Sequence, residues 1–360
     1  MKNISKEFWN GKRVLITGHT GFKGSWLCIW LQSMNAKIFG LSLEPNSPYS
    51  LFNQARVGDF MMSTIGDICD YSTVFRIMKE AQPEIVIHMA AQPLVLYSYD
   101  NPVETYSTNI MGTVHVLEAV LKVPSVKVVI NVTSDKCYEN REWIWSYREN
   151  EPMGGYDPYS SSKGCSELIT SAYRRSFYTK FGIGLASARS GNVIGGGDWS
   201  KDRLIPDILY AFEKNKSVII RNKSAIRPWQ HVLDALSGYL LLAEQLYKSG
   251  ELFSDAWNFG PSEQDTKSVQ WIVEYMVNLW GDGATWEIEE NQQTHEAKLL
   301  RLDTSKANKI LGWSPNWQLD TALEKVVDWH INWLKKRDIR ILCQEQIKSY
   351  EFELSINSKK

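Results

Sequence analysis

A tyrosine and a lysine four residues apart, Tyr159 and Lys163, are the two side chains whose types and spacing best suit chemistry. The segment from Asp157 to Phe181 has the pattern of a long helix, and residues four apart share one face of a helix. A nearby ammonium stabilises a phenolate, so the tyrosine can serve as a base near neutral pH. The spacing therefore predicts a pair that takes the proton of an alcohol while a hydride leaves its carbon.

Three more reactive residues, Ser134, Asp135 and Lys136, follow a segment rich in β-branched residues, Val126 to Val132, which predicts a strand. In a doubly wound sheet, the carboxyl ends of the strands face the ligand crevice. We therefore expect Ser134 to hydrogen-bond the hydroxyl that Tyr159 deprotonates. Asp135 and Lys136 would place an acid/base pair beside the same centre.

The elements that must position these groups begin with a glycine-rich run near the N-terminus. The run follows a predicted strand, Lys12 to Thr17, and opens a predicted helix, Gly21 to Met34. Bare amides and the positive end of the helix dipole meet at such a turn and suit the pyrophosphate of a dinucleotide. The residues that we expect to line the cofactor here are Thr17, Gly18, His19, Gly21, Phe22, Lys23 and Gly24.

The second predicted strand, Lys37 to Leu43, indicates which nicotinamide cofactor binds. Its end offers Ser42 or Glu44 to the ribose 2′-hydroxyl, and period two places both on one face. A 2′-phosphate would require an arginine or lysine, and the stretch from Leu41 to Leu51 contains neither. The sequence therefore favours NAD over NADP.

Two positions near this cofactor site keep two interpretations each. Asp67, beside Ile68 after a third predicted strand, would contact the adenine amino group or cap a turn. His19 lies between glycines where the backbone approaches phosphate, so its imidazole would weaken or gate NAD binding, or simply point to solvent. If the gating hypothesis holds, replacing His19 by glycine tightens NAD binding.

The first half of the chain alternates strand-like and helix-like segments. Its strands are nearly continuous apolar runs, which predicts a doubly wound, parallel α/β sheet of the Rossmann type with a smaller, mixed α/β substrate region. We assign 1–190 and about 228–258 to NAD binding, 191–227 and 259–350 to the substrate, and 351–360 to a tail that frays from Ser355. Further helices are predicted over 70–81, 102–121, 233–247, 268–279 and 320–334, and further strands over 60–65, 84–88 and 184–188.

The overall composition narrows the class of protein. The 360 residues include 40 Lys and Arg against 41 Asp and Glu, so no basic field indicates nucleic acid or an acidic membrane surface. Five scattered cysteines without a Cys-x-x-Cys pair are typical of a reducing cytoplasm and predict neither a disulfide scaffold nor a metal site. The N-terminus lacks the apolar core of a signal peptide, and no apolar run is long enough to span a bilayer.

Together, the Ser, Tyr and Lys resemble the short-chain dehydrogenase/reductase superfamily, and the glycine run with the chain length resembles its extended, nucleotide-sugar-modifying branch. The residues after Ser134 separate the families of that branch. Epimerases generally carry small uncharged residues there, and dTDP-glucose dehydratases carry Asp-Glu. Asp135-Lys136 is instead similar to the CDP-glucose 4,6-dehydratases, as is the segment Glu151 to Tyr159.

The resemblance extends over nearly the whole chain and implies further site residues. Ala90 and Gln92 lie in a segment that resembles the loop around the nicotinamide ribose, and Asn109 in one that supports the active site. Segments that resemble the family's substrate loops contain the candidate substrate-binding residues Asn192, Arg203, Arg227 and Gln230. Arg227 would clamp a diphosphate or form an ordinary surface ion pair.

The resemblance also implies a mechanism in which NAD is used and restored. Tyr159 would take the C4 hydroxyl proton of CDP-glucose, and Lys163 would lower the tyrosine pKa and bind the nicotinamide ribose. Asp135 would help the C6 hydroxyl leave as water. Lys136 would remove the C5 proton or hold Asp135 in place by an ion pair. The product, CDP-4-dehydro-6-deoxyglucose, serves deoxysugar and O-antigen biosynthesis in this family.

Two alternatives and the assembly remain to be considered. The first alternative is a dehydratase or 4-epimerase for a dTDP-, UDP- or GDP-linked sugar, and the second is a non-catalytic NAD-binding regulator. An intact set of Ser134, Tyr159 and Lys163 disfavours the regulator. The helices over 102–121 and 157–181 show apolar positions on more than one face, and the resemblance implies that they pair in a four-helix bundle of a homodimer or homotetramer.

Overall fold

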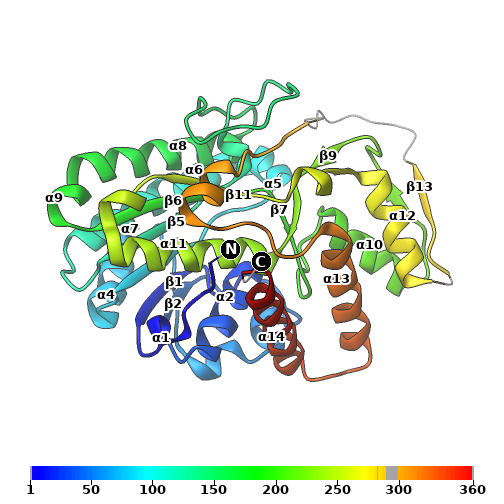
Figure 1. Cartoon of the computed structure of the whole chain (residues 1–360), viewed down its shortest axis with the longest axis horizontal. Helices are drawn as coiled ribbons and strands as arrows, with labels where there is room; N and C mark the ends of the chain where they lie inside the picture. Colours follow the sequence, from blue (N-terminus) through cyan, green and yellow to red (C-terminus); the bar gives the residue numbers. More distant parts are fainter. Residues whose placement is uncertain (1, 282, 289–298, 359–360) are drawn as a thin grey trace.

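A seven-stranded parallel sheet is the framework of the molecule in the computed structural model, which describes residues 2–281, 283–288 and 299–358 (Figure 1). The strand order is β11-β6-β5-β4-β1-β2-β3, so the direction of winding reverses between β1 and β4. This is the predicted doubly wound sheet. Its strands are β1 (Arg13–Thr17), β2 (Lys37–Ser42), β3 (Met62–Ile65), β4 (Ile85–His88), β5 (Val128–Val132), β6 (Gly184–Ser190) and β11 (Ala256–Phe259).

The register of the central strands brings their carboxyl ends to one edge. Thr17 of β1 lies opposite His88 of β4, His88 lies opposite Asn131 of β5, and Val132 lies opposite Ala188 of β6. The segments that leave these strands therefore start side by side. They carry the glycine-rich run, the loop after His88 and the Ser134 segment, as the sequence predicted.

Helices cover both faces of the sheet, and each face has its own apolar core. One face packs against α2 and α11, and the other against α4 and α7. The helices of this region are α1 (Lys6–Trp9), α2 (Phe22–Ser33), α3 (Leu51–Gln54), α4 (Tyr71–Ala81), α5 (Val95–Asp100), α6 (Pro102–Tyr106), α7 (Gly112–Leu121), α8 (Pro158–Tyr173), α9 (Thr179–Phe181), α11 (Val232–Phe253) and α14 (Ile339–Asn357). Short 3-10 turns occupy Val57–Phe60, Asp135–Cys137 and Glu263–Asp265.

The two long helices predicted over 102–121 and 157–181 are each interrupted. A π-turn, Ser107–Met111, separates α6 from α7, and a second, Arg174–Tyr178, separates α8 from α9. Such turns shift the helix phase and often lie at functional sites. The first places Asn109 inside the protein, where its side chain bonds Gln92 and Ser162.

The prediction of a tail frayed from Ser355 is wrong for the described residues, because α14 continues to Asn357, and residues 359–360 lie outside the described part of the chain. Its buried residues recur every three to four positions and join the core that covers α2. Trp30 of α2 donates its indole hydrogen to the Glu351 carboxylate at 3.0 Å, which fixes the two helices together. The described part of the supposed tail therefore belongs to the core of the sheet region.

The smaller region lies to the right of the sheet in Figure 1 and contains short strand pairs and three helices around a second core. The predicted helices over 268–279 and 320–334 are confirmed as α12 and α13, whereas α10 was not predicted. The elements are β7 (Asn192–Ile194), α10 (Leu204–Glu213), β8 (Val218–Ile220), β9 (Ile226–Arg227), β10 (Trp229–His231), β12 (Lys267–Ser268), α12 (Val269–Trp280), β13 (Trp286–Ile288), a π-turn (Ala307–Leu311) and α13 (Leu319–Leu334). Among the described helices, none is both long enough and apolar enough to span a bilayer.

Candidate active site

Helix α8 presents Tyr159 and Lys163 on its buried face. Asp157 caps the helix by accepting the Ser160 amide at 2.9 Å, and Pro158 occupies the first turn, so the start of the helix is fixed locally. The side chains of Tyr159 and Lys163 are both buried. Their positions follow the four-residue spacing that the sequence predicted.

The electrostatics around Tyr159 differ from the expectation. Burial raises its pKa to about 12, and among the main influences a hydrogen bond with Ser134 and the charge of Arg203 act in the opposite direction. Lys163, which was expected to lower the tyrosine pKa, is not among these main influences. Burial lowers the pKa of Lys163 itself to about 8, with a further contribution from the charge of Lys23.

The Ser134 segment forms a tight 3-10 turn directly after β5. The Ser134 hydroxyl accepts the Lys136 amide at 3.3 Å and donates to Asp135 Oδ1 at 3.0 Å. Lys136 Nζ lies 3.5 Å from the same carboxylate oxygen. The other oxygen, Asp135 Oδ2, is buried and has no hydrogen-bond partner in the described part of the chain. One Asp135 oxygen is thus held, and the other is a buried acceptor whose hydrogen-bonding capacity is unused among the described residues.

The glycine-rich turn fits a dinucleotide pyrophosphate. A Cβ on Gly24 would lie 2.2 Å from the Gly18 carbonyl oxygen, and a Cβ on Gly18, whose φ is +78°, would lie 2.7 Å from the Ala90 nitrogen. Gly21 precedes α2 without any side-chain cap, so the first amides of the helix are left for an anion. Close backbone approach and bare amides are the features that such a ligand requires.

His19 is buried, which excludes the solvent-facing interpretation, whereas its influence on NAD binding stays a prediction. Its ring is buried against Gly40 of β2, Nε2 lies 2.7 Å from the Ser63 hydroxyl, and Phe52 meets it edge to face at 5.4 Å. Burial lowers its pKa to about 4. The expectation of a solvent-facing ring is therefore wrong, and the imidazole instead connects the turn to the edge of the sheet.

The end of β2 carries one of the two predicted ribose ligands in a fixed position. The Ser42 hydroxyl lies 2.7 Å from that of Thr20, which donates to the Leu43 carbonyl at 2.9 Å, whereas Glu44 is exposed. Asp67 is exposed and accepts the Cys69 amide at 2.8 Å, as the turn interpretation required. The Ile68 side chain is part of the apolar core.

The loop after β4 is tied to β1 and to the first π-turn. The Thr17 hydroxyl accepts the amides of Met89 and Ala90 at 3.1 and 3.2 Å and lies 2.7 Å from His88 Nδ1. The Gln92 amide donates to Asn109 Oδ1 at 2.9 Å. These contacts support the predicted loop without showing that Gln92 or Asn109 touches a ligand.

The four candidate substrate residues lie in different surroundings. The charge of Arg203 reaches Tyr159 and Lys23, so the structure brings Arg203 to the reactive centre, where it pairs with Asp198 at 3.2 Å. Gln230 is buried and donates to the Phe259 carbonyl at 2.7 Å. The other two occupy short strands, Asn192 in β7 and Arg227 in β9.

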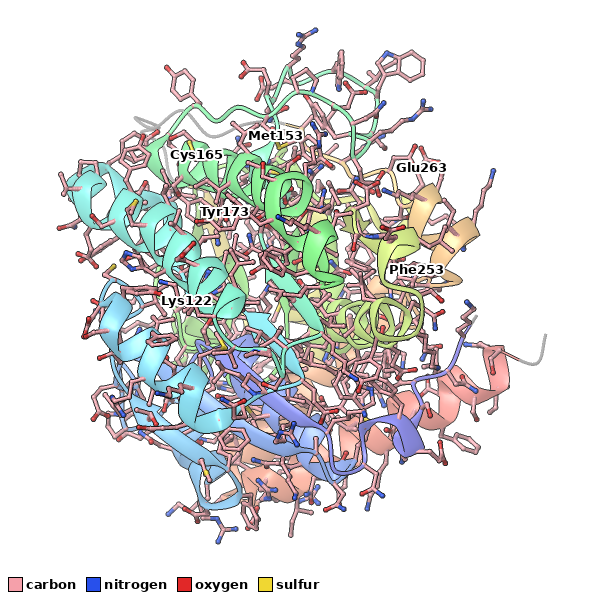
Figure 2. All side chains as sticks on the ribbon, turned by 90° about the vertical axis from the view of Figure 1, so that its left-hand side faces the viewer. Lys122, Met153, Cys165, Tyr173, Phe253 and Glu263 are labelled. Carbon is pink, nitrogen blue, oxygen red and sulfur yellow. The ribbon has the colours of Figure 1, made fainter. Side chains whose placement is uncertain are left out.

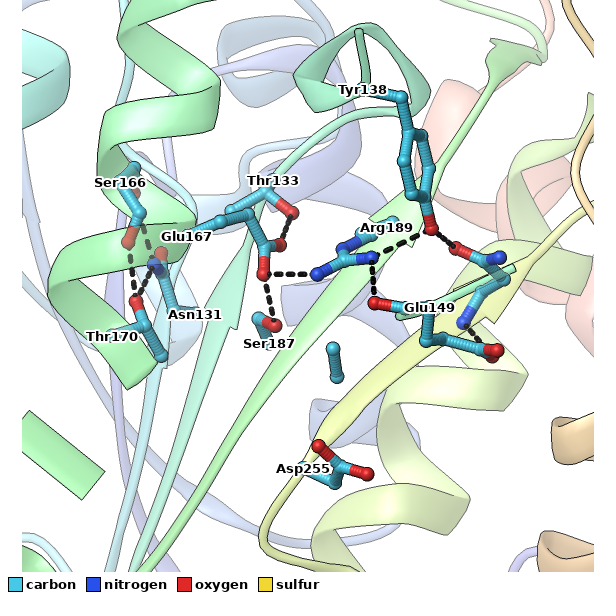
Figure 3. A network of polar contacts seen from close by, with 12 residues as sticks. Asn131, Thr133, Tyr138, Glu149, Ser166, Glu167, Thr170, Ser187, Arg189 and Asp255 are labelled. Atoms are coloured by element: carbon cyan, nitrogen blue, oxygen red, sulfur yellow. Dashed lines mark hydrogen bonds and ion pairs between the residues drawn. The ribbon is translucent and has the colours of Figure 1, made fainter. Parts of the chain in front are cut away.

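A buried polar network beside the site was not predicted as functional. Figure 3 shows that Glu167 and Arg189 lie at its centre, between Thr133, Ser187 and Tyr138. The available signal was the position of Glu167, four residues after Lys163 on the same buried helix face. The arginine could not have been paired with it from spacing alone.

Comparisons with known proteins agree with this geometry. The family model described as GDP-mannose 4,6 dehydratase matches residues 15–326. A CDP-glucose 4,6-dehydratase of Salmonella typhimurium is 57% identical over 96% of this chain and 98% of its own length. A solved dTDP-glucose 4,6-dehydratase of Streptomyces venezuelae, with NAD bound, has a TM-score of 0.77 at 22% identity and covers 89% of this chain and 97% of its own.

A UDP-glucose 4-epimerase of Thermotoga maritima shares the fold equally well, with a TM-score of 0.78 at 22% identity over 89% of this chain and 99% of its own. The fold alone therefore does not separate epimerases from dehydratases. The family model and the close relative do, and they agree with the Asp135-Lys136 pair beside Tyr159. The chain belongs to the GDP-mannose 4,6 dehydratase family, within the extended short-chain dehydrogenase/reductase superfamily.

Proposed function

We propose that this protein is a lyase that dehydrates CDP-D-glucose to CDP-4-dehydro-6-deoxy-D-glucose with NAD as its cofactor. The observation that carries the proposal is the Asp135-Lys136 pair on a turn beside Tyr159, with one buried carboxylate oxygen left without a partner. An acid of this kind serves elimination, whereas a simple epimerase has no need of it. The choice of CDP-glucose rests on the relative from Salmonella typhimurium.

The glycine-rich turn would hold the NAD pyrophosphate, with Ser42 at the adenosine ribose and Lys163 at the nicotinamide ribose. When bound, NAD accepts a hydride from the sugar and later returns it. The structures of related dehydratases and epimerases solved with NAD support this choice. The uncharged Ser42–Thr20 contact supports NAD over NADP, because it offers no cation to a 2′-phosphate.

Tyr159 would remove the proton of the C4 hydroxyl, which Ser134 orients. The pKa of Tyr159, about 12 in the protein alone, must fall for this step. The cations Lys163, Lys23 and Arg203 around the centre would stabilise the phenolate once substrate excludes water. The new C4 ketone then makes the C5 proton acidic.

Asp135 would donate a proton to the C6 hydroxyl, which leaves as water, and neutral Lys136 would take the C5 proton. When the hydride returns to C6, Lys136 would give that proton back to C5. The proton that Tyr159 took from the C4 hydroxyl balances the one that Asp135 gave to the water. The 3.5 Å contact between Lys136 and Asp135 also suits a positioning role for the lysine. Replacing Lys136 by methionine separates these roles. A proton-transfer role predicts a variant that oxidises C4 but forms no dehydrated product, and full turnover would refute it.

The smaller region would bind the nucleotide sugar through Arg203, Arg227, Asn192 and Gln230. We assign residues 191–227 and 259–338 to this task, because α14 packs on the sheet region instead. Arg203 has the strongest support, since its charge already reaches Tyr159. Replacing Arg203 by methionine should raise KM for the nucleotide sugar more than it lowers kcat.

We further propose a homodimer formed through the 102–121 and 158–181 helices. Figure 2 shows α7 and α8 side by side, with Lys122 labelled just after the end of α7 and Tyr173 at the end of α8. Their exposed apolar residues are Val103, Met111, Leu168, Phe177 and Phe181. Leu168→Glu should yield monomers in sedimentation experiments. All five cysteines are free thiols, which suits the reducing cytoplasm where we place the enzyme.

The decisive experiment is mass spectrometry of the protein incubated with NAD and, separately, CDP-glucose, dTDP-glucose, UDP-glucose and GDP-mannose. Loss of one water from CDP-glucose alone is the expected result. Water loss from another sugar nucleotide would preserve the mechanism and replace the substrate. No water loss from any of them, with NAD bound, would contradict the proposal and favour an epimerase or a non-catalytic NAD-binding protein.

A further inference from the structure

The turn that carries Ser134, Asp135 and Lys136 is anchored at both of its ends. We call the segment 133–138 the catalytic arch. At its first end, the Thr133 amide donates to the Ala188 carbonyl at 2.9 Å, and the Thr133 hydroxyl donates to Glu167. At its second end, the Tyr138 hydroxyl accepts from Arg189 at 2.6 Å. The reactive residues lie between these two anchors.

The two anchors are joined by one buried ion pair. Arg189 Nη2 lies 2.7 Å from Glu167 Oε2, and both side chains are almost fully buried. The same carboxylate oxygen accepts the Ser187 hydroxyl at 2.7 Å. Figure 3 shows this chain of contacts running from Thr133 through the ion pair to Tyr138. Glu167 and Arg189 therefore connect the two ends of the arch, through Thr133 at one end and Tyr138 at the other.

The ion pair also connects the arch to the helix that carries the other catalytic groups. Tyr159, Lys163 and Glu167 are spaced by four residues and all lie on the buried face of α8. Burial alone would raise the pKa of Glu167, but the charge of Arg189 and the hydrogen bonds hold it below its ordinary value. The carboxylate is thus charged and fully engaged, which gives the contact a defined geometry.

The second anchor extends to the segment that follows the arch. The Tyr138 hydroxyl donates to Asn258 Oδ1 at 2.7 Å, and Arg189 Nη1 also donates to the Glu149 carbonyl at 3.0 Å. The Glu149 side chain in turn accepts the Asn258 amide at 3.0 Å. Arg189 therefore links the arch to the loop around Glu149, while Tyr138 itself links the arch to β11.

We propose that Glu167 and Arg189 are positioning residues that set the distance between the catalytic arch and the Tyr159–Lys163 face of α8, and that water elimination depends on them more than C4 oxidation does. This inference rests on the proposed dehydration. The oxidising groups Tyr159 and Lys163 share one rigid helix. The eliminating groups Asp135 and Lys136 both lie on the arch. Of the groups that serve oxidation, the arch carries only Ser134, which orients the C4 hydroxyl. Loosening the ion pair should therefore slow elimination more than oxidation.

The test measures two products from four variants. Glu167→Gln and Arg189→Met break the ion pair, and Arg189→Lys keeps a cation. Tyr138→Phe frees one end of the arch and keeps both charges of the pair, although it removes the hydroxyl that accepts from Arg189. The matched control is Thr170→Val on the next turn of α8. Its hydroxyl accepts Asn131 Nδ2 at 2.7 Å, and it has no contact with the arch in the described structure.

Glu167→Gln and Arg189→Met should form dehydrated product about 100-fold more slowly, a loss expected for a misplacement near 1 Å. Quenched reactions should then contain the oxidised sugar nucleotide, which has lost two hydrogens but no water. Arg189→Lys should recover part of the rate. The NAD affinity of these variants, measured by calorimetry, should stay within about threefold of that of the parent protein. The control Thr170→Val should keep its activity within the same range, because Thr170 does not contact the arch.

Outcomes that overturn the inference are distinct from failure of the proposed function. If the unaltered protein dehydrates no sugar nucleotide, the proposed function fails first. If the unaltered protein works, equal slowing of oxidation and elimination without any oxidised intermediate refutes a selective positioning role. Should an ion-pair variant fail to fold, Tyr138→Phe decides, because unchanged product ratios in that folded variant would refute the role of the arch.

Discussion

Two buried carboxylates in this protein have opposite electrostatic character. Glu167 beside the catalytic arch has a pKa below its ordinary value, whereas burial raises the pKa of Asp234 in α11 to about 7. Both accept several hydrogen bonds. Asp234 Oδ1 accepts the Asn316 amide at 2.6 Å and the Tyr350 hydroxyl at 2.8 Å. The difference is Arg189, because the described residues form no ion pair with Asp234.

The comparison shows that hydrogen bonds alone do not keep a buried carboxylate charged. Asp234 Oδ2 is buried with no hydrogen-bond partner among the described residues, so its charge is incompletely compensated. Glu167, which must keep its position and its negative charge near the reacting centre, therefore needs the positive charge of Arg189. Asp234 only connects α11 to α14, so it can be either protonated or charged.

The largest expected effect comes from leaving the Glu167 charge without its cation. Arg189→Met should lower the free energy of unfolding by about 3–5 kcal/mol at neutral pH, because an uncompensated charge stays buried. Urea denaturation of the NAD-free protein measures this value. A loss below about 1 kcal/mol would show that solvent reaches Glu167 and that the contrast with Asp234 is false.

The opposite effect is expected at Asp234. Because its pKa rises from about 3.8 unfolded to about 7 folded, its charge destabilises the fold progressively between those values and fully above them. Asp234→Asn keeps an acceptor for the Asn316 and Tyr350 donors and removes the charge. Unfolding free energy should rise by about 2–4 kcal/mol near pH 8 and change little near pH 4. Equal effects at both pH values would contradict this account.

Removing the charges of both Glu167 and Arg189 tests whether the loss of stability in Arg189→Met comes from the unpaired charge. The double variant Glu167→Gln with Arg189→Met should be about 1–3 kcal/mol more stable than Arg189→Met alone, because no unpaired charge remains. Denaturation of the parent protein, both single variants and the double variant under one condition gives the coupling energy. If the double variant is as unstable as the single one, the cost lies in packing instead of charge.

The smallest effect is expected at the hydroxyl of Tyr350. Tyr350→Phe removes the 2.8 Å hydrogen bond to Asp234 and should destabilise the protein by about 1 kcal/mol. It should also move the pH-dependent loss of stability to higher pH, because that bond lowers the pKa of Asp234. Thermal melts between acidic and mildly basic pH follow the shift. An unchanged pH profile would show that Tyr350 does not influence the Asp234 charge.

The sequence predicted those parts of the fold and site that local patterns encode. The glycine turn, the central strands and the Tyr159–Lys163 helix depend on period, caps and spacing within a few residues. Helix α14 also had a readable signal in apolar residues every three to four positions, which the prediction of a tail overlooked. The π-turns and the Glu167–Arg189 contact had no such local signal. The ion pair exists because α8 packs against β6, a property of the assembled fold.

The packing of α14 on α2 has a consequence for the order in which the protein folds during synthesis. Helix α2 begins at the glycine turn, and the helix that covers it, α14, is made much later in the chain. At translation rates of about 5–20 residues per second, roughly 15–60 s separate the two. During that interval Trp30 lacks the Glu351 carboxylate that accepts its indole hydrogen. We expect the nascent cofactor region to stay incompletely packed until α14 has been made.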